Sequence, residues 1–161
     1  MLRIAIPLFC LLLTLGVSAG HTRAQNTMGS ETGLPLPRFI SLKAGEANLR
    51  AGPGQKYPIR WIYKRRHLPV RVHDEHGHWR AVTDPWGGEG WLHKSLLSGR
   101  RTVMVMKELS PLHREPRADS AIVLYAQRRV IGTLERCEGI WCRLIVDGRA
   151  GWMLAERLYG N

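Results

Sequence analysis

The chain has 161 residues and is strongly basic, with 24 Lys and Arg against 13 Asp and Glu and a formal net charge of +11. Its carboxylates are scattered through charged turns and no Gly-x-Ser-x-Gly elbow occurs, which excludes the common carboxylate-pair and serine-nucleophile sites. We therefore expect no enzymatic activity, no catalytic residues and no cofactor. The positive charge indicates an anionic partner, or it serves only to keep the protein soluble.

The amino terminus has the pattern of a secretory signal peptide, which we assign to residues 1–24. A short basic start precedes an almost unbroken apolar run from Ile4 to Val17, and small residues suitable for cleavage end at Ala19 and at Ala24. The alternative is a membrane anchor, but the run is shorter than the roughly 20 apolar residues that span a bilayer. The sequence thus predicts a periplasmic or secreted protein that contacts the membrane only through the uncleaved signal.

Export changes which anionic partner the charge favours. Removal of the first 19 residues takes away Arg3 and no acid, so 24 − 1 = 23 basic residues remain against 13 acidic ones, a formal charge of +10. Outside the cytoplasm, cell-wall polymers, lipopolysaccharide phosphates and anionic lipid headgroups are the available polyanions. We therefore expect no nucleic-acid partner.

After the signal, the composition predicts a flexible leader over residues 25–37, which are rich in Gly, Thr, Ser, Asn and Pro. From Arg38 onward, short apolar runs alternate with turn residues, and none keeps a helical period for three turns. The chain is therefore predicted to be all-β, in small barrels or sandwiches. The expected strands are 40–42, 59–63, 68–72, 79–82 and 90–92, and then 103–106, 122–124, 130–134, 141–146 and 151–154.

Two stretches repeat one skeleton at a period of about sixty residues, which indicates one structural unit used twice. We place the units at residues 38–101 and 102–161. A unit of this size buries only about 60% of its unfolded surface, so packing of the two against each other would add stability. The skeleton is Asn48 to Gly54, Trp79 and Gly90-Trp91-Leu92 in the first unit, and Leu112 to Pro116, Trp141 and Gly151-Trp152-Met153 in the second, divergent unit.

Cys137 and Cys142 are the only cysteines that remain once the signal has been removed. In an oxidising compartment, two thiols that flank a four-residue hairpin turn are candidates for a structural disulfide. Closing so short a loop would stabilise the fold by roughly 2 kcal/mol on the chain-entropy model. A redox pair is less favoured, because the spacing lacks the two-residue gap between the cysteines of redox motifs. Half of a metal site is also less favoured, because no second pair of cysteines exists to complete a zinc site.

Four histidines, His73, His76, His78 and His93, suggest a metal site near a hairpin tip. The alternative is a solvated turn that happens to be rich in histidine. The cluster is absent from the second unit and its spacing matches no strong template, so we expect no bound metal. These imidazoles would add positive charge as the pH falls through about 6.5.

Trp86 lies in a turn-rich loop, residues 84–89, where a large aromatic side chain has no obvious core to fill. An exposed aromatic side chain beside basic ones is suited to recognition of a sugar ring or a peptide. The second unit has Asp147-Gly148-Arg149 at this place and no tryptophan, so a site that uses Trp86 belongs to the first unit only.

The segment from Asn48 to Gly54, the tryptophan after the hairpin and the late Gly-Trp resemble the bacterial SH3-like domain, a small β-barrel of exported proteins. The resemblance covers about 48–97 and, more loosely, 110–158, and residues 91–101 and 137–142 resemble a proteobacterial subfamily with two tandem copies. It implies a binding or targeting module, often for peptidoglycan or its stem peptides. Family members that cut the cell wall carry a separate Cys/His catalytic domain, and we expect that this chain has no room for such a domain.

We therefore expect a basic groove on the first barrel, in which the aromatic side chains alternate with Lys and Arg. Its partner would be cell-wall peptidoglycan or a peptide ligand, and the alternative is another envelope protein held through an exposed strand or loop. In the second copy Arg114-Glu115-Pro116 replaces the glycine-rich loop, so that copy is expected to be a structural partner. The predicted ligand-binding residues are Arg50, Tyr57, Trp61, Trp79, Trp86 and Trp91, with Lys56, Arg60, Lys64, Arg65 and Arg66 between them.

Overall fold

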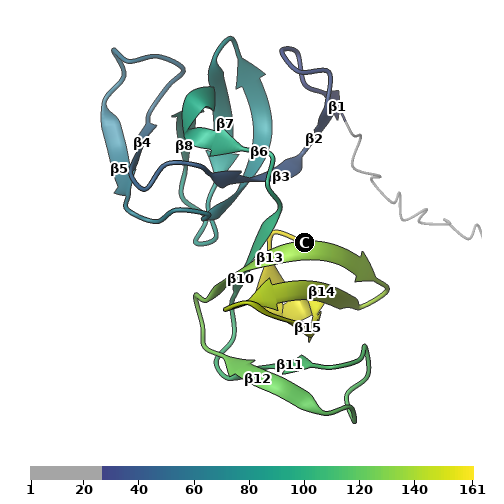
Figure 1. Ribbon diagram of the computed structural model, residues 1–161. Helices are drawn as coiled ribbons and strands as arrows, with labels where there is room; N and C mark the ends of the chain where they lie inside the picture. The colour runs from purple at the N-terminus through teal and green to yellow at the C-terminus, as the bar shows by residue number, and fades with distance from the viewer. Residues whose placement is uncertain (1–26) are drawn as a thin grey trace, which may run out of the picture.

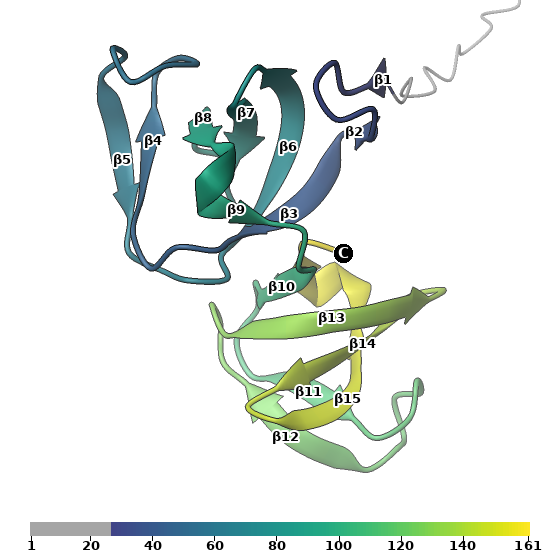
Figure 2. The same cartoon turned by 45° about the horizontal axis from the view of Figure 1, so that its top comes forward.

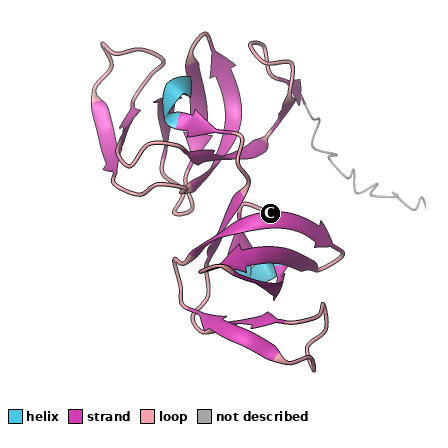
Figure 3. Cartoon of the chain, viewed as in Figure 1, coloured by secondary structure: helices cyan, strands magenta, loops and turns pink. Residues whose placement is uncertain are grey.

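The computed structural model describes residues 27–161, which form two seven-stranded antiparallel sheets and one small hairpin (Figure 1). The two units follow one another along the chain, and only two short 3-10 helices interrupt the strands of the described residues (Figure 3). The all-β, duplicated architecture predicted from the sequence is confirmed. No helix in this range is long and apolar enough to cross a membrane. The predicted signal peptide, residues 1–24, lies outside the described residues.

The first unit has the strand order β5-β4-β8-β7-β6-β3-β9. A 3-10 helix, η1 (Lys94–Leu96), joins β8 to β9, and the side chain of His93 caps its first turn. Alternate residues of the strands point into one core, which includes Leu42, Val70 and Leu92. The strands are β3 (Arg38–Leu42), β4 (Ala47–Arg50), β5 (Ile59–Tyr63), β6 (Pro69–His76), β7 (Trp79–Thr83), β8 (Glu89–His93) and β9 (Leu97–Ser98).

The second unit repeats this topology with the order β12-β11-β15-β14-β13-β10-β16, and η2 (Ala155–Arg157) takes the place of η1. Its separate core includes Val103, Leu112 and Met153. The strands are β10 (Thr102–Val105), β11 (Ser110–His113), β12 (Ile122–Ala126), β13 (Ile131–Glu138), β14 (Trp141–Val146), β15 (Arg149–Leu154) and β16 (Leu158–Tyr159).

The strand register shows which residues of the two units are equivalent. Arg50 pairs with Trp91 between β4 and β8, and His113 pairs with Trp152 between β11 and β15. The repeated skeleton of the sequence sets Arg114-Glu115-Pro116 in the place of Arg50 to Gly54, and the register corrects this correspondence by one residue. The glycine-rich loop after β4 (residues 51–58) and the loop after β11 (residues 114–121) are equal in length, so His113 occupies the place of Arg50 and Arg114 is the first residue of its loop.

The recurring Gly-Trp dipeptide has a packing cause. A Cβ atom at Gly90 would lie 2.7 Å from the carbonyl oxygen of Arg50, and one at Gly151 would lie 2.7 Å from that of His113. Only glycine allows β8 and β15 to pass so close to β4 and β11. Side chains alternate between the two faces of these strands, so Trp91 and Trp152 lie on the opposite face from Leu92 and Met153, which are fully buried.

Cys137 and Cys142 form the predicted disulfide, with an S–S distance of 1.98 Å. They face each other in the β13–β14 hairpin, and Gly139 in the turn has a φ of 56°. Glycine adopts this left-handed conformation without the cost that a side chain would bring. The bridge therefore closes a tight hairpin at the tip of the second unit, as the sequence predicts.

Residues 27–37 differ from the flexible leader predicted by their composition. They form a hairpin of β1 (Thr27–Met28) and β2 (Pro35–Leu36), and Leu36 is buried in the first core. The carboxylate of Glu75 holds the turn, because it accepts hydrogen bonds from the backbone and hydroxyl of Thr32 at 2.9 and 2.8 Å. A single buried acceptor in β6 thus orders a segment that has little apolar content of its own.

Specific contacts join the two units at the junction between β9 and β10. The hydroxyl of Thr102 donates to the carbonyl of His67 at 2.8 Å, and the hydroxyl of Tyr159 donates to the carbonyl of Thr83 at 2.8 Å. The Tyr159 ring also packs edge-on against Phe39, with 5.1 Å between centroids. Both views place the C-terminus at this junction (Figures 1 and 2). The second unit is therefore packed against the first through hydrogen bonds and aromatic contact.

Candidate functional site

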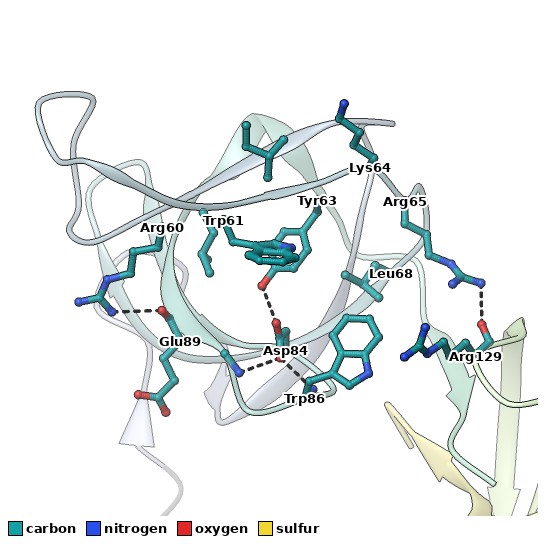
Figure 4. A pocket seen from close by; sticks show the side chains of 13 residues that line it. Arg60, Trp61, Tyr63, Lys64, Arg65, Leu68, Asp84, Trp86, Glu89 and Arg129 are labelled. Atoms are coloured by element: carbon teal, nitrogen blue, oxygen red, sulfur yellow. Dashed lines mark hydrogen bonds between the residues drawn. The ribbon is translucent and has the colours of Figure 1, made fainter.

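An open cavity of about 830 Å³ lies on the first unit, between the outer strand β5 and the loop that follows β7 (Figure 4). β5 stands at the edge of its sheet, and four consecutive residues from Ile59 to Ile62 are exposed. One further wall residue, Arg129, comes from the second unit. The cavity therefore combines an exposed strand, a loop and a side chain from the neighbouring copy.

A buried polar pair forms the floor of this cavity. The hydroxyl of Tyr63 donates to Oδ2 of Asp84 at 2.9 Å, and both residues are buried. Burial, the hydrogen bond to Asp84 and its negative charge all raise the pKa of Tyr63 well above its ordinary value. The phenol thus remains a hydrogen-bond donor throughout the physiological pH range.

Asp84 also fixes the loop that carries Trp86. Its Oδ1 accepts hydrogen bonds from the backbone N–H groups of Trp86 and Gly88, both at 2.8 Å. A Cβ atom at Gly88 would lie only 2.6 Å from Oδ2 of Asp84, and Gly87 has a φ of 86°. The Asp-Pro-Trp-Gly-Gly sequence therefore makes an aspartate-centred turn, in which the glycines allow the carboxylate to sit inside the loop.

Two indole rings lie beside the cavity, and both are exposed far more than large aromatic side chains usually are. Trp61 projects from β5 with 62% of its surface exposed, and Trp86 projects from the loop with 48% exposed. Exposed apolar surface bordered by polar groups is characteristic of binding sites. Flat aromatic faces of this kind suit sugar rings and the methyl groups and peptide bonds of short peptides.

The charges around the cavity are mainly positive. Four cationic residues line it, and the acidic residues that line it are Asp84 and Glu89, so the formal sum is 4 − 2 = +2. Asp84 already accepts three hydrogen bonds, which leaves it little capacity to bind a cation. The rim therefore favours a ligand that carries negative charge. The cationic residues are Arg60, Lys64, Arg65 and Arg129.

The predicted ligand-binding residues do not form one groove. Trp61 and Trp86 line the cavity just described, whereas Arg50 and Trp79 line a separate hollow of about 210 Å³ beside His93. Tyr57 and Trp91 line neither of these two hollows. The guanidinium of Arg50 donates to the carbonyls of Gln55 and Tyr57, at 3.0 and 2.8 Å. Arg50 therefore supports the glycine-rich loop.

Sequence reasoning did not identify Tyr63, Asp84 and Arg129 as site residues. Asp84 could have been identified from its sequence context, because an aspartate at the start of a glycine-rich turn commonly accepts hydrogen bonds from the backbone N–H groups that follow it. Tyr63 resembles any buried aromatic at a strand end. Arg129 lies in the other unit, and only the packing of the two units brings it to the cavity.

The equivalent hollow of the second unit, about 510 Å³, has different chemistry. The strand register places Leu124 where the first unit has Trp61, and Ala126 where it has Tyr63. A tight Asp147-Gly148 turn replaces the Trp86 loop, and both of its residues have positive φ. Of these two hollows, only that of the first unit is therefore lined by tryptophan side chains.

The four histidines of the predicted cluster, His73, His76, His78 and His93, are not brought together in one group. His78 and His93 pack edge-on with 5.8 Å between ring centroids, while His73 Nδ1 lies 3.3 Å from the hydroxyl of Thr83. Within residues 27–161 no group of three or more His, Cys, Asp or Glu side chains is placed to hold a metal ion. His93 instead accepts a hydrogen bond from the backbone of Ser95 at the start of η1.

Two solved structures from Trichomonas vaginalis are similar to parts of the chain. NlpC2 is 15% identical over 78% of this chain and 48% of its own, with a TM-score of 0.36, and NlpC1 is 13% identical over 92% and 51%, with a TM-score of 0.37. The chain thus spans about half the length of either. No curated protein matches it. The model of the bacterial SH3 domain matches residues 43–99 and again residues 106–160, so the chain belongs to the bacterial SH3 domain family and carries two tandem copies of that domain.

Proposed function

We propose that this protein is an exported, non-enzymatic binding module, and that the cavity of its first SH3 domain holds peptidoglycan through the stem peptides. The observation that carries the proposal is the pair of exposed indoles, Trp61 and Trp86, beside one open cavity with a cationic rim. The site of action would be the periplasm or the outside of the cell, as the amino-terminal pattern of the sequence predicts.

The chemistry of a stem peptide suits this cavity. Stem peptides are short, carry small apolar side chains and end in free carboxylates. Their methyl groups and peptide bonds would pack on the indole faces, and their carboxylates would lie near the cationic rim. A cavity of about 830 Å³ is within the range of sites that enclose small ligands.

The chemistry of the described residues favours binding over catalysis. Cys137 and Cys142 are joined in a disulfide, so neither offers a thiolate as a nucleophile. Asp84, the buried carboxylate of the cavity, is held by the Tyr63 hydroxyl and two backbone N–H groups. Both carboxylate oxygens of Asp84 accept hydrogen bonds from the protein itself, so this residue shapes the loop rather than acting on a ligand.

Co-sedimentation with purified peptidoglycan sacculi tests this proposal. The mature chain should sediment at low and at moderate salt, and to a greater extent than an unrelated exported protein of similar charge. The double variant W61A/W86A should fall to the level of that control protein. Tyr125→Ala is the matched variant, because Tyr125 is 59% exposed on the outer strand of the second unit and should bind as wild type does.

A second candidate function is supported by the outer strand β5. This strand ends its sheet, and its exposed residues include Ile59, Trp61 and Ile62. An exposed apolar edge strand is suited to pairing with a strand of another envelope protein. Sedimentation no better than that of the control protein would favour this alternative over wall binding.

A further inference from the structure

Arg129 of the second domain completes the cavity of the first domain. Its side chain lies beside Trp86, with its guanidinium carbon 6.0 Å from the centre of the ring (Figure 4). Its backbone carbonyl accepts a hydrogen bond from the guanidinium of Arg65 at 2.6 Å. One arginine from each domain therefore stands at the same end of the cavity, next to an exposed indole.

The conformation of the chain at Arg129 is determined by the fold. Arg129 has a φ of 71°, and its N–H donates to the carbonyl of Val105. His67, at the equivalent turn of the first domain, has a φ of 65°, and its N–H donates to the carbonyl of Leu42. Because a left-handed residue with a side chain is costly, the same turn in both copies indicates a position held by the surrounding structure.

The two domains are held together close to the loop that carries Trp86. Tyr159 of the second domain donates to the carbonyl of Thr83, the residue just before Asp84. Burial raises the pKa of Tyr159 to about 12, although the nearby charge of Arg71 opposes this shift. The hydroxyl of Tyr159 thus stays protonated and keeps its hydrogen bond to Thr83 throughout the physiological pH range. The position of Arg129 relative to Trp86 is fixed by contacts on both sides of the junction.

The positive charge at this end of the cavity is not neutralised by acidic residues of the protein. The ion pairs within residues 27–161 involve Arg38, Arg80, Arg117, Arg136 and Arg143. Neither Arg65 nor Arg129 is among them. The Arg129 guanidinium makes no hydrogen bond to any residue of that range, so its donors remain available to a ligand.

We propose that Arg65 and Arg129 together bind a free carboxylate of the ligand, whose apolar part lies against Trp61 and Trp86. The second domain is then part of the binding site, and it supplies the residue that selects an anionic ligand. A guanidinium group presents parallel N–H donors that match the two oxygens of a carboxylate. This inference rests on the proposed function and adds to it the chemical group that is recognised.

The test compares two forms of one probe, a synthetic stem tetrapeptide with free carboxyl groups and the same peptide with its carboxyl groups amidated. Binding to the full mature chain is measured by isothermal titration calorimetry. We expect wild type to bind the free acid about tenfold more tightly than the amide, the scale of one hydrogen bond to a charged group. Arg129→Gln and Arg65→Gln should each lose most of this preference.

Arg128→Gln is the matched control, because Arg128 is an exposed neighbour that does not line the cavity. It should keep the full preference for the free acid. Near-ultraviolet circular dichroism establishes that each variant is folded. Equal affinities of Arg129→Gln and Arg128→Gln for the free acid would overturn this inference while leaving peptide binding intact. Failure of wild type to bind either peptide or sacculi would overturn the proposed function as well.

Discussion

The hydroxyl of Tyr63 donates a 2.9 Å hydrogen bond to Oδ2 of Asp84 beneath the exposed indoles of the first domain. The other carboxylate oxygen holds the backbone of Trp86, so this pair connects the barrel core to the cavity rim. A buried carboxylate that loses one of its donors is left partly unsatisfied, at a free-energy cost larger than that of an exposed group.

We expect Tyr63→Phe to lower the free energy of unfolding by about 1–3 kcal/mol, because Asp84 stays buried with one donor fewer. The same change should weaken binding to sacculi, since the Trp86 loop would lose part of its support. Urea denaturation and co-sedimentation measure the two effects. Tyr125→Phe is the control, because Tyr125 is exposed and should leave both unchanged. A Tyr63→Phe protein as stable as wild type would contradict the role of the pair.

The two glycines that precede Trp91 and Trp152 should be intolerant of any side chain. At Gly90 and at Gly151 a Cβ atom would lie within 2.7 Å of backbone and leucine atoms of the neighbouring strand. We expect Gly90→Ala and Gly151→Ala each to cost about 1–3 kcal/mol through overpacking. Gly99→Ala, where nothing lies within 4 Å of the added atom, should be close to neutral. Equal thermal unfolding temperatures for all three variants would contradict this prediction, because they would show that the paired strands can shift to admit a methyl group without loss of stability.

Local patterns in the sequence were sufficient for the fold and for the two tryptophans that line the cavity, Trp61 and Trp86. Strand-length apolar runs, the repeated Gly-Trp and the turn between Cys137 and Cys142 all act through neighbours in sequence or through one strand pairing. Trp86 could be identified because a large aromatic side chain in a glycine-rich turn has no local core to join. Trp61 was predicted from its aromatic character, and its exposure follows from the position of β5 at the sheet edge.

The features that the sequence did not reveal depend on long-range contacts. The hairpin at residues 27–36 is ordered by Glu75, whose carboxylate bonds to a residue 43 positions away in the chain. Arg129 contributes to the first cavity only because Tyr159 and Thr102 join the two domains. Composition and periodicity carry no information about such contacts, because they describe segments one at a time.

The disulfide should contribute to stability without contributing to ligand binding. Its loop spans five positions of sequence, and closing a loop of this size stabilises by about 2 kcal/mol on the chain-entropy model. We expect a Cys137→Ser/Cys142→Ser double variant to lose about that much free energy of unfolding. Its binding to sacculi should be unchanged, because the bridge lies at the far end of β13 from Arg129. Reduction of wild type with dithiothreitol should reproduce the loss, whereas reduced binding in either experiment would contradict this separation.

Glu75 should make stability sensitive to acid. Its side chain is fully buried beside Arg38 and Arg80. Burial alone would raise its pKa, but hydrogen bonds from Arg38, Thr32 and the backbone of Glu31, together with the charge of Arg38, lower it to about 2. Because the folded pKa lies below the unfolded value of about 4.3, the carboxylate stabilises the fold fully above that value. This contribution, about 3 kcal/mol, is lost as the pH falls towards 2.

We therefore expect Glu75→Gln to lower the free energy of unfolding by about 3 kcal/mol at pH 7 and to remove most of the pH dependence between about pH 4.3 and 2. Urea denaturation across this range measures it, and hydrogen exchange should show the amides of residues 27–36 losing protection in the variant at pH 7. Glu138→Gln is the matched change, because Glu138 forms an exposed pair with Arg136, which contributes about 0–1 kcal/mol. If both variants kept the pH dependence of wild type, carboxylates other than Glu75 would be its source, and the hairpin would need another anchor.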